Sequence, residues 1–173
     1  LLNIMSSGEM GITYRKLGPA DAAQYRAIRL ESIRAHPESF GSGYEAQAKL
    51  PKLMFEQALE RPYDQRFLIG AFDQDELIGI CGFVPKSLTN TDLAHVGTII
   101  QMYVRAAYSG RKVGFNLMTA VIAEAFKLGD IEQLVLGVRI GNLSAITVYE
   151  QVGFVTDEDA VGLDEGFQQM VLK

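Results

Sequence analysis

A strand, a glycine-containing turn and a helix are encoded in the stretch Val104-Arg-Ala-Ala-Tyr-Ser-Gly-Arg-Lys-Val-Gly-Phe-Asn-Leu-Met118. Gly110 and Gly114 let the backbone approach a ligand closely. A helix that begins here presents unpaired N–H groups and the positive end of its dipole. Arg111 and Lys112 add two positive charges. The stretch therefore suits a bound phosphate, although an ordinary strand–turn–helix connection explains it equally well.

Two well-known nucleotide-binding patterns are absent from this stretch. It contains neither the Gly-x-x-x-x-Gly-Lys-[Ser/Thr] pattern of nucleoside-triphosphate loops nor the Gly-x-Gly-x-x-Gly pattern of dinucleotide folds. The helix that follows is apolar nearly all round, with a narrow polar stripe formed by Asn116, Thr119 and Lys127. We therefore expect a firmly packed helix whose start points at an anion of another kind.

A second segment, about thirty residues further on, is Asn142-Leu-Ser-Ala-Ile-Thr-Val-Tyr-Glu-Gln-Val-Gly-Phe154. Asn142 is a good N-cap residue, and Gly153 fits the left-handed position that ends a helix. Phe154 can pack back onto the last turn and fix how the Tyr149 ring is aimed. Tyr149 is then either a half-buried aromatic of an amphipathic helix or a proton donor, because a free phenol has a pKa of about 10.

The remaining chain predicts a mixed α/β fold. Strands are expected at 12–17, 66–72, 76–84, 94–104 (the longest candidate), 134–138, 154–156 and 167–172. Further helices are expected from Pro19 to His36 and from Pro51, with Leu53 or Met54, Ala58 and Leu59 facing inward, and a loop at 37–44. This order implies a mixed sheet flanked by helices. No linker divides 12–173, which we expect to be one domain, and residues 1–11 are expected to be a flexible leader or cloning remnant.

Composition excludes several classes. The net charge of −5 and pI near 5.1 over 173 residues disfavour a nucleic-acid binder, and no apolar run is long enough to suggest a membrane span. Cys81 is the only cysteine, so no intramolecular disulfide can form and a reducing, cytoplasmic location is expected. Its apolar surroundings predict a buried residue. His36 and His95, without a cysteine cluster, predict no zinc site.

The two segments and the order of elements resemble the GNAT superfamily of acyl-CoA-dependent N-acyltransferases over about residues 12–173. The family's phosphate turn is usually Gln/Arg-x-x-Gly-x-Gly/Ala. The stretch Ser109-Gly-Arg-Lys-Val-Gly114 departs from it at Ser109 and Lys112 and keeps the closing Gly114. The family's second pattern, Asn-x-x-Ala-x-x-x-Tyr-x-x-x-Gly-Phe, is matched at every position from Asn142 to Phe154.

This resemblance implies a GNAT-like α/β (α+β) domain: a mixed, mostly antiparallel central sheet with a splayed strand pair, and helices on both faces. It implies acetyl-CoA as cosubstrate and no metal. Tyr149 would protonate the departing CoA sulfur. The implied cofactor-binding residues are Met102, Val104 and Asn142 for the pantetheine arm, and the backbone N–H groups of Arg111, Lys112, Val113, Gly114 and Phe115 for the pyrophosphate.

The implied reaction is direct attack of a small-molecule or peptide amine on the thioester. Many relatives carry a Glu base on the strand before the turn, where this chain has Gln101, which could only position a water. The base therefore stays open among His95, Glu31 and Glu45. A segment at 29–42 resembles a loop of bacterial members, and homodimers are common in the family. The alternatives are a non-catalytic acyl-CoA sensor or binding module on the same fold, and a structural domain without a CoA site.

Overall fold

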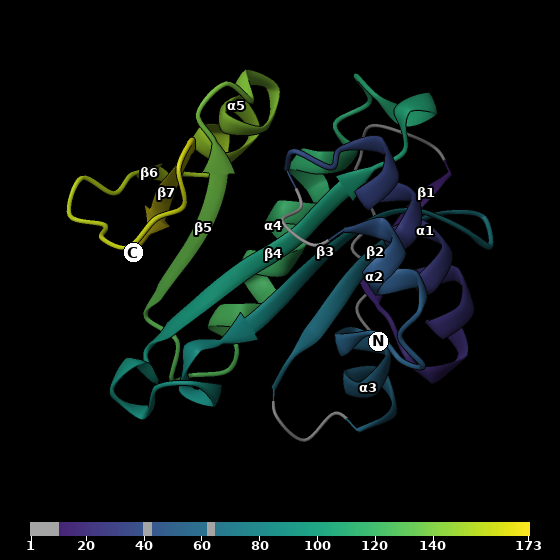
Figure 1. Cartoon of the computed structure of the whole chain (residues 1–173), viewed down its shortest axis with the longest axis horizontal. Helices are drawn as coiled ribbons and strands as arrows, with labels where there is room; N and C mark the ends of the chain where they lie inside the picture. Colours follow the sequence, from purple (N-terminus) through teal and green to yellow (C-terminus); the bar gives the residue numbers. More distant parts are fainter. Residues whose placement is uncertain (1–10, 40–42, 62–64) are drawn as a thin grey trace.

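The computed structural model describes residues 11–39, 43–61 and 65–173 (Figure 1). The leader expected at the start of the chain therefore lies, up to residue 10, outside the described residues. The helices and strands are, in chain order, β1 (Ile12–Lys16), α1 (Ala22–Ala35), α2 (Tyr44–Ala48), α3 (Met54–Glu60), β2 (Phe67–Asp73), β3 (Glu76–Pro85), β4 (Val96–Val104), α4 (Val113–Phe126), β5 (Gln133–Arg139), α5 (Leu143–Gln151), β6 (Val155–Thr156) and β7 (Phe167–Leu172).

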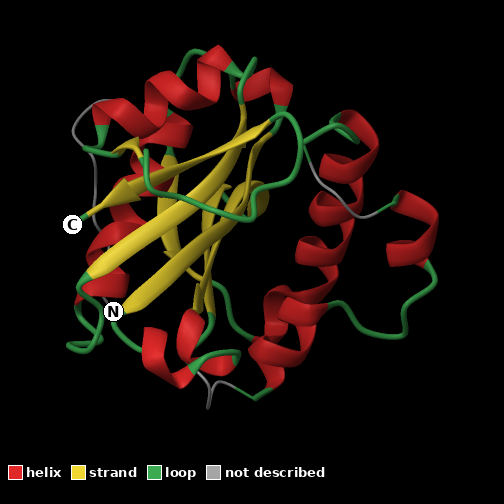
Figure 2. Cartoon of the chain, turned by 60° about the vertical axis from the view of Figure 1, so that its left-hand side comes forward, coloured by secondary structure: helices red, strands yellow, loops and turns green. Residues whose placement is uncertain are grey.

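The strands form one seven-stranded sheet in the order β1-β2-β3-β4-β5-β7-β6. Every neighbouring pair is antiparallel except β4 and β5, which are parallel. Helices cover both faces of this sheet, as Figure 2 shows. The predicted mixed, mostly antiparallel sheet between helices is confirmed.

Proline and capping residues account for the helix boundaries. Pro19 occupies the first position of a short 3-10 turn that leads into α1, and α1 ends at Ala35, two residues before Pro37. The second predicted helix begins at Met54 rather than at Pro51. Its start is set by the Glu56 carboxylate, which accepts a hydrogen bond of 2.6 Å from the backbone N–H of Leu53.

Several expectations need correction. The sequence did not predict α2, whose first residue Tyr44 was assigned to a loop. Leu53 is buried in front of α3, whereas Met54 is 37% exposed, so the inward position belongs to Leu53. The longest strand among the described residues is the ten-residue β3, because β4 begins only at Val96 and has nine residues. In α4, Phe126 is exposed despite its apolar side chain.

Two apolar clusters pack on the two faces of the sheet. One cluster joins α4 and Tyr149 of α5 to the strands, and it contains Cys81, which is fully buried as predicted. The other joins α1 and α3 to the opposite face, and it contains Tyr25 and Tyr103. Consecutive residues of β4 alternate between these clusters, so Met102 lies on the α4 side and Tyr103 on the α1 side.

The parallel pair β4 and β5 separates part of the way along its length. The register joins Val96 to Gln133 and Thr98 to Val135, and no further pairs follow between these two fully described strands. Figure 1 shows β4 and β5 diverging from this closed end. Beyond it β4 is irregular, because Gln101 adopts a left-handed backbone conformation (φ 58°) opposite a register shift in β3. Such a bulge bends a strand and increases its twist.

Candidate functional site

A cleft of about 1280 Å³ opens where β4 and β5 separate. Its walls come from 99–104 of β4, 136–139 of β5, the start of α4, one side of α5 and the end of α1. Eight of the nine site residues predicted from the sequence line it: Met102, Val104, Lys112, Val113, Gly114, Phe115, Asn142 and Tyr149. Arg111 is not among the lining residues, and its guanidinium lies 5.2 Å from the centre of the Tyr108 ring.

The start of α4 forms one wall of the cleft. The first hydrogen bond of this helix runs from the Asn116 N–H to the Lys112 carbonyl, at 3.0 Å. The amide groups of Val113, Gly114 and Phe115 therefore precede the helical ladder and lie beside the cleft. Together with the helix dipole, they make this wall suitable for an anion.

Lys112 caps α4 in a left-handed backbone conformation (φ 57°, ψ 18°). This conformation costs a residue with a Cβ about 1–2 kcal/mol, whereas glycine adopts it freely. The family pattern has glycine at this position, whereas in this chain a lysine adopts the left-handed conformation. Gly110 shares this type of conformation (φ 74°), with no heavy atom within 4 Å of where its Cβ would lie.

Gly114 matters for close packing rather than for its backbone angles. A Cβ at this position would lie 3.0 Å from the terminal methyl group of Met102. A methyl group at residue 114 would require the Met102 terminal methyl to move by a few tenths of an ångström, so the close approach of α4 to β4 favours a small residue here.

The caps of α5 form as predicted. The Asn142 side-chain oxygen accepts from the Ala145 N–H at 3.4 Å and from the Ser144 hydroxyl at 3.2 Å. Gly153 has φ 105°, and the Phe154 ring packs 6.4 Å from the Tyr149 ring, tilted by 59°. The orientation of Tyr149 is thus fixed from the far end of its own helix.

Tyr149 is only 8% exposed, yet it lines the cleft. Burial raises the pKa of its hydroxyl above the usual value for a phenol, and the nearby Cys81 acts in the same direction. In the described part of the chain, the Tyr149 hydroxyl has no hydrogen-bond partner. The group is therefore protonated at neutral pH and available to donate.

None of the three bases considered from the sequence lies in the cleft. His95 precedes β4 at its closed end, where its carbonyl accepts from Glu132 and Gln133, about 20 Å from Met102 along an extended strand. Glu45 is exposed on α2 and does not line the cleft.

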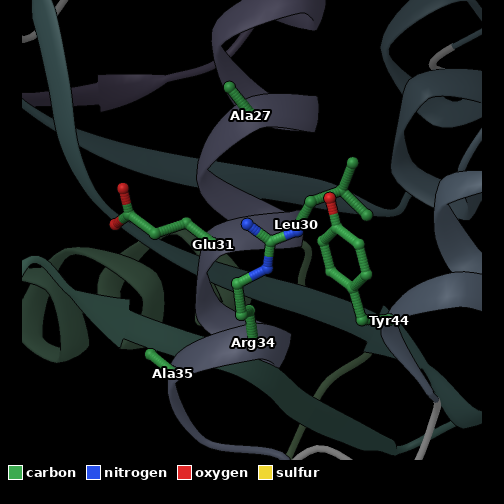
Figure 3. Close-up of a pocket in the computed structure, with 6 residues that line it drawn as sticks. All are labelled: Ala27, Leu30, Glu31, Arg34, Ala35 and Tyr44. Carbon is green, nitrogen blue, oxygen red and sulfur yellow. The ribbon is translucent and has the colours of Figure 1, made fainter.

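Glu31, on α1, has its carboxylate engaged by two partners near the end of β4. It accepts a hydrogen bond of 2.8 Å from the Tyr103 hydroxyl and pairs with Arg105 at 3.2 Å. It lines a separate groove of about 530 Å³, where Figure 3 shows the Arg34 guanidinium lying between Glu31 and the Tyr44 ring. The Arg34 guanidinium lies 4.1 Å from the centre of that ring, so two of the residues that line the groove are stacked on each other.

Gln101, the residue in place of the family's glutamate, is also held. Its side-chain oxygen accepts a hydrogen bond of 2.7 Å from the hydroxyl of Tyr25, which is fully buried on α1. This bond ties the β4 bulge to α1 and positions the Gln101 amide at the cleft wall.

Sequence reasoning missed a group of charged and polar residues at the end of the cleft nearest α1. They are Arg29, His36, Glu38 and Arg139. Arg29 is 6% exposed on α1, and the next two lie at and just beyond the end of that helix. The contacts of these residues with β4 and β5 are long-range and leave no local pattern in the sequence. The only signal for this group was a histidine at the end of the first helix.

Neither a metal centre nor a membrane segment is found within the described ranges. No three His, Cys, Asp or Glu side chains there are grouped as metal ligands would be. No helix in the same residues has the length and apolar character needed to cross a membrane.

The chain is similar to known proteins both in sequence and in fold. Residues 25–154 match the family model described as the acetyltransferase (GNAT) family. Human N-alpha-acetyltransferase 30 is 29% identical over 126 residues, which cover 66% of this chain but only 34% of the human protein. The chain thus spans about a third of the length of that relative.

Two solved structures share the fold. YncA of Salmonella typhimurium, solved with its cofactor acetyl-CoA, has a TM-score of 0.73 at 18% identity, covering 94% of both chains. The PaiA N-acetyltransferase of Thermoplasma acidophilum, in complex with coenzyme A, has a TM-score of 0.73 at 21% identity, covering 95% of this chain and 99% of the other.

Proposed function

The chain belongs to the acetyltransferase (GNAT) family, and on that premise we propose that it transfers the acetyl group of acetyl-CoA to a primary amine. The observation that carries this proposal is the cleft between β4 and β5. It gathers the start of α4, the free edge of β4 and the buried, protonated phenol of Tyr149 around one space.

We propose that the parts of acetyl-CoA lie in order along the cleft. The N–H groups of Val113, Gly114 and Phe115 would hold the pyrophosphate at the start of α4. The pantetheine arm would then lie along β4, against Met102 and Val104, with Asn142 on the opposite side. The two structural neighbours were solved with acetyl-CoA or coenzyme A, which supports acetyl-CoA as the cosubstrate proposed for this chain.

The chemistry follows from this placement. Holding amine and thioester together removes much of the entropic cost of their encounter. A backbone N–H near Met102 would polarise the thioester carbonyl as charge develops on its oxygen. Burial raises the pKa of Tyr149, so its hydroxyl is protonated at neutral pH and would donate that proton to the departing sulfur.

The acceptor is proposed as a small-molecule or peptide amine. The name of the human relative, an N-alpha-acetyltransferase, directs attention to α-amino groups, and that of the Thermoplasma acidophilum neighbour to N-acetylation more broadly. We further propose that residues 12–173 act as one N-acetyltransferase domain, in a bacterial cytoplasm, without a metal and with homodimers as the assembly to test first.

The test begins with calorimetric binding of acetyl-CoA, followed by thiol release from acetyl-CoA with a panel of peptides, polyamines and amino acids. The proposal expects binding and turnover with at least one amine. Tight binding without turnover on a broad panel would instead favour an acyl-CoA sensor. Absence of binding at millimolar acetyl-CoA would leave only a structural domain.

A further inference from the structure

The amine that attacks a thioester must first lose a proton, and the residues that line the cleft offer few groups to take it. Among the described lining residues, the ionisable side chains are Arg29, His36, Glu38, Tyr103, Tyr108, Lys112, Arg139 and Tyr149. Arginine, lysine and tyrosine carry their protons at neutral pH. Only His36 and Glu38 are left as bases.

His36 lies on the face of the sheet opposite Tyr149. Its ring packs edge-on against Tyr103 with the ring centres 6.1 Å apart. Tyr103 belongs to the apolar cluster on the α1 side, whereas Tyr149 belongs to the cluster on the α4 side. The cleft between β4 and β5 thus has His36 at one mouth and the proposed acid, Tyr149, at the other.

The surroundings of His36 suit a group that becomes a cation. Its Nδ1 lies 3.6 Å from a carboxylate oxygen of Glu38, an ion pair that forms once the ring is protonated. The residue also caps the C-terminus of α1, where the helix dipole favours positive charge. With Nδ1 turned to Glu38, Nε2 is the nitrogen left to meet an acceptor.

We propose that His36 is the general base of the acetyl transfer, with Glu38 as its positioning residue. This inference rests on the proposed function and supplies the base that it lacks. His36 takes one proton from the acceptor ammonium, directly or through one water, and later passes it to solvent. The freed nitrogen lone pair forms the N–C bond at the thioester carbonyl. As the C–S bond breaks, Tyr149 protonates the sulfur, and the second amine proton restores Tyr149.

Steady-state kinetics of His36→Gln with an amine that the wild type acetylates tests this assignment. We expect kcat to fall by about 100-fold or more, while calorimetric affinity for acetyl-CoA and the unfolding temperature stay as in the wild type. The matched control is His95→Gln, which changes the chain's other histidine at the closed end of β4 and should retain the wild-type rate.

Chemical rescue separates a base from a structural side chain. Imidazole added to His36→Ala should restore part of the lost rate, and it should leave Glu38→Gln unchanged. If His36→Gln turns over like the wild type, or if only Glu38→Gln loses the rate, the assignment is wrong although the enzyme remains an acetyltransferase. If the wild type acetylates no amine, the proposed function fails and this inference fails with it.

Discussion

Arg139, at the end of β5, donates a hydrogen bond of 3.1 Å to the backbone carbonyl of Glu38, just beyond α1. Residues 101 positions apart in the chain are thus joined across the end of the cleft nearest α1. The Arg139 guanidinium also lies 5.5 Å from the centre of the Phe167 ring on β7. This contact holds the segment that carries His36 and Glu38 against the β5 side of the cleft.

Replacing Arg139 with Gln should therefore affect the acceptor more than the cofactor. The loop after α1 loses an anchor worth about 1 kcal/mol, so KM for the amine should rise roughly threefold to tenfold. KM for acetyl-CoA should stay within twofold. A variant whose acetyl-CoA KM rises while its amine KM is unchanged would show that Arg139 serves the cofactor instead.

The left-handed conformation of Lys112 predicts that glycine stabilises the turn. In Lys112→Gly, relief of backbone strain outweighs the added freedom of the unfolded chain, and unfolding should require about 1 kcal/mol more. For a chain of this size, that raises the midpoint of thermal unfolding by about 2–4 °C. Affinity for acetyl-CoA should fall in the same variant, because a positive charge beside the proposed pyrophosphate site is lost.

The matched control for this prediction is Gly110→Ala. Gly110 has φ 74° and open space around the missing Cβ, so the added methyl group costs only backbone strain. Calorimetric unfolding should show this variant destabilised by about 1 kcal/mol. Equal melting temperatures for Lys112→Gly and the wild type would mean that the strain at residue 112 is relieved in solution.

Local signals explain why much of the fold could be predicted. The turn before α1 begins at Pro19, and α1 ends shortly before Pro37. The ends of α5 are marked by Asn142 and Gly153. These residue types could be recognised in the sequence because each acts on its own backbone. Resemblance supplied the splayed strands, which no periodicity in the sequence indicates.

Long-range packing explains what was missed. Nothing in the sequence suggests that Gln101 would adopt a left-handed conformation, since a hydrogen bond from Tyr25, 76 residues away, holds its side chain. The same limit applies to His36, whose contact with Tyr103 crosses from α1 to β4. His95 was a candidate base because it lies on the strand predicted to precede the turn. The length of that strand, however, places it at the closed end of β4, away from Met102.

Lowering the pH should remove the contribution of Asp21 to the stability of the fold. Hydrogen bonds from Arg15 at 2.8 and 2.9 Å, and from the Gly18 N–H at 2.8 Å, lower the pKa of this carboxyl below its usual 3.8. A pKa lowered in the folded state means that the stabilisation is present above pH 3.8 and is lost as pH falls through the folded value.

Asp21→Asn should accordingly lose about 1 kcal/mol of unfolding free energy at pH 7, a modest figure because Arg15 is half-exposed. Urea unfolding should show this difference shrinking below pH 3.8. Asp130→Asn, at an exposed position, is the control and should differ little from the wild type at either pH. A difference for Asp21→Asn that is independent of pH would contradict the assignment.

Cys81 should be inert in the folded protein. It is fully buried, with its sulfur 3.8 Å from that of Met118, and burial raises the pKa of the thiol. An aromatic disulfide reagent at pH 8 should therefore detect no thiol in the native protein and one per chain after unfolding in guanidinium. Rapid reaction of the native protein would show that the core around β3 and α4 opens readily.

The most direct test of the whole account is the rate of CoA thiol release by Tyr149→Phe, measured with an amine that the wild type acetylates. The substitution keeps the ring that packs against Phe154 and removes only the hydroxyl. The account predicts a kcat lower by about 100-fold, with acetyl-CoA affinity within twofold of the wild type. A variant that releases thiol as fast as the wild type would contradict the assignment of Tyr149 as the acid of the cleft.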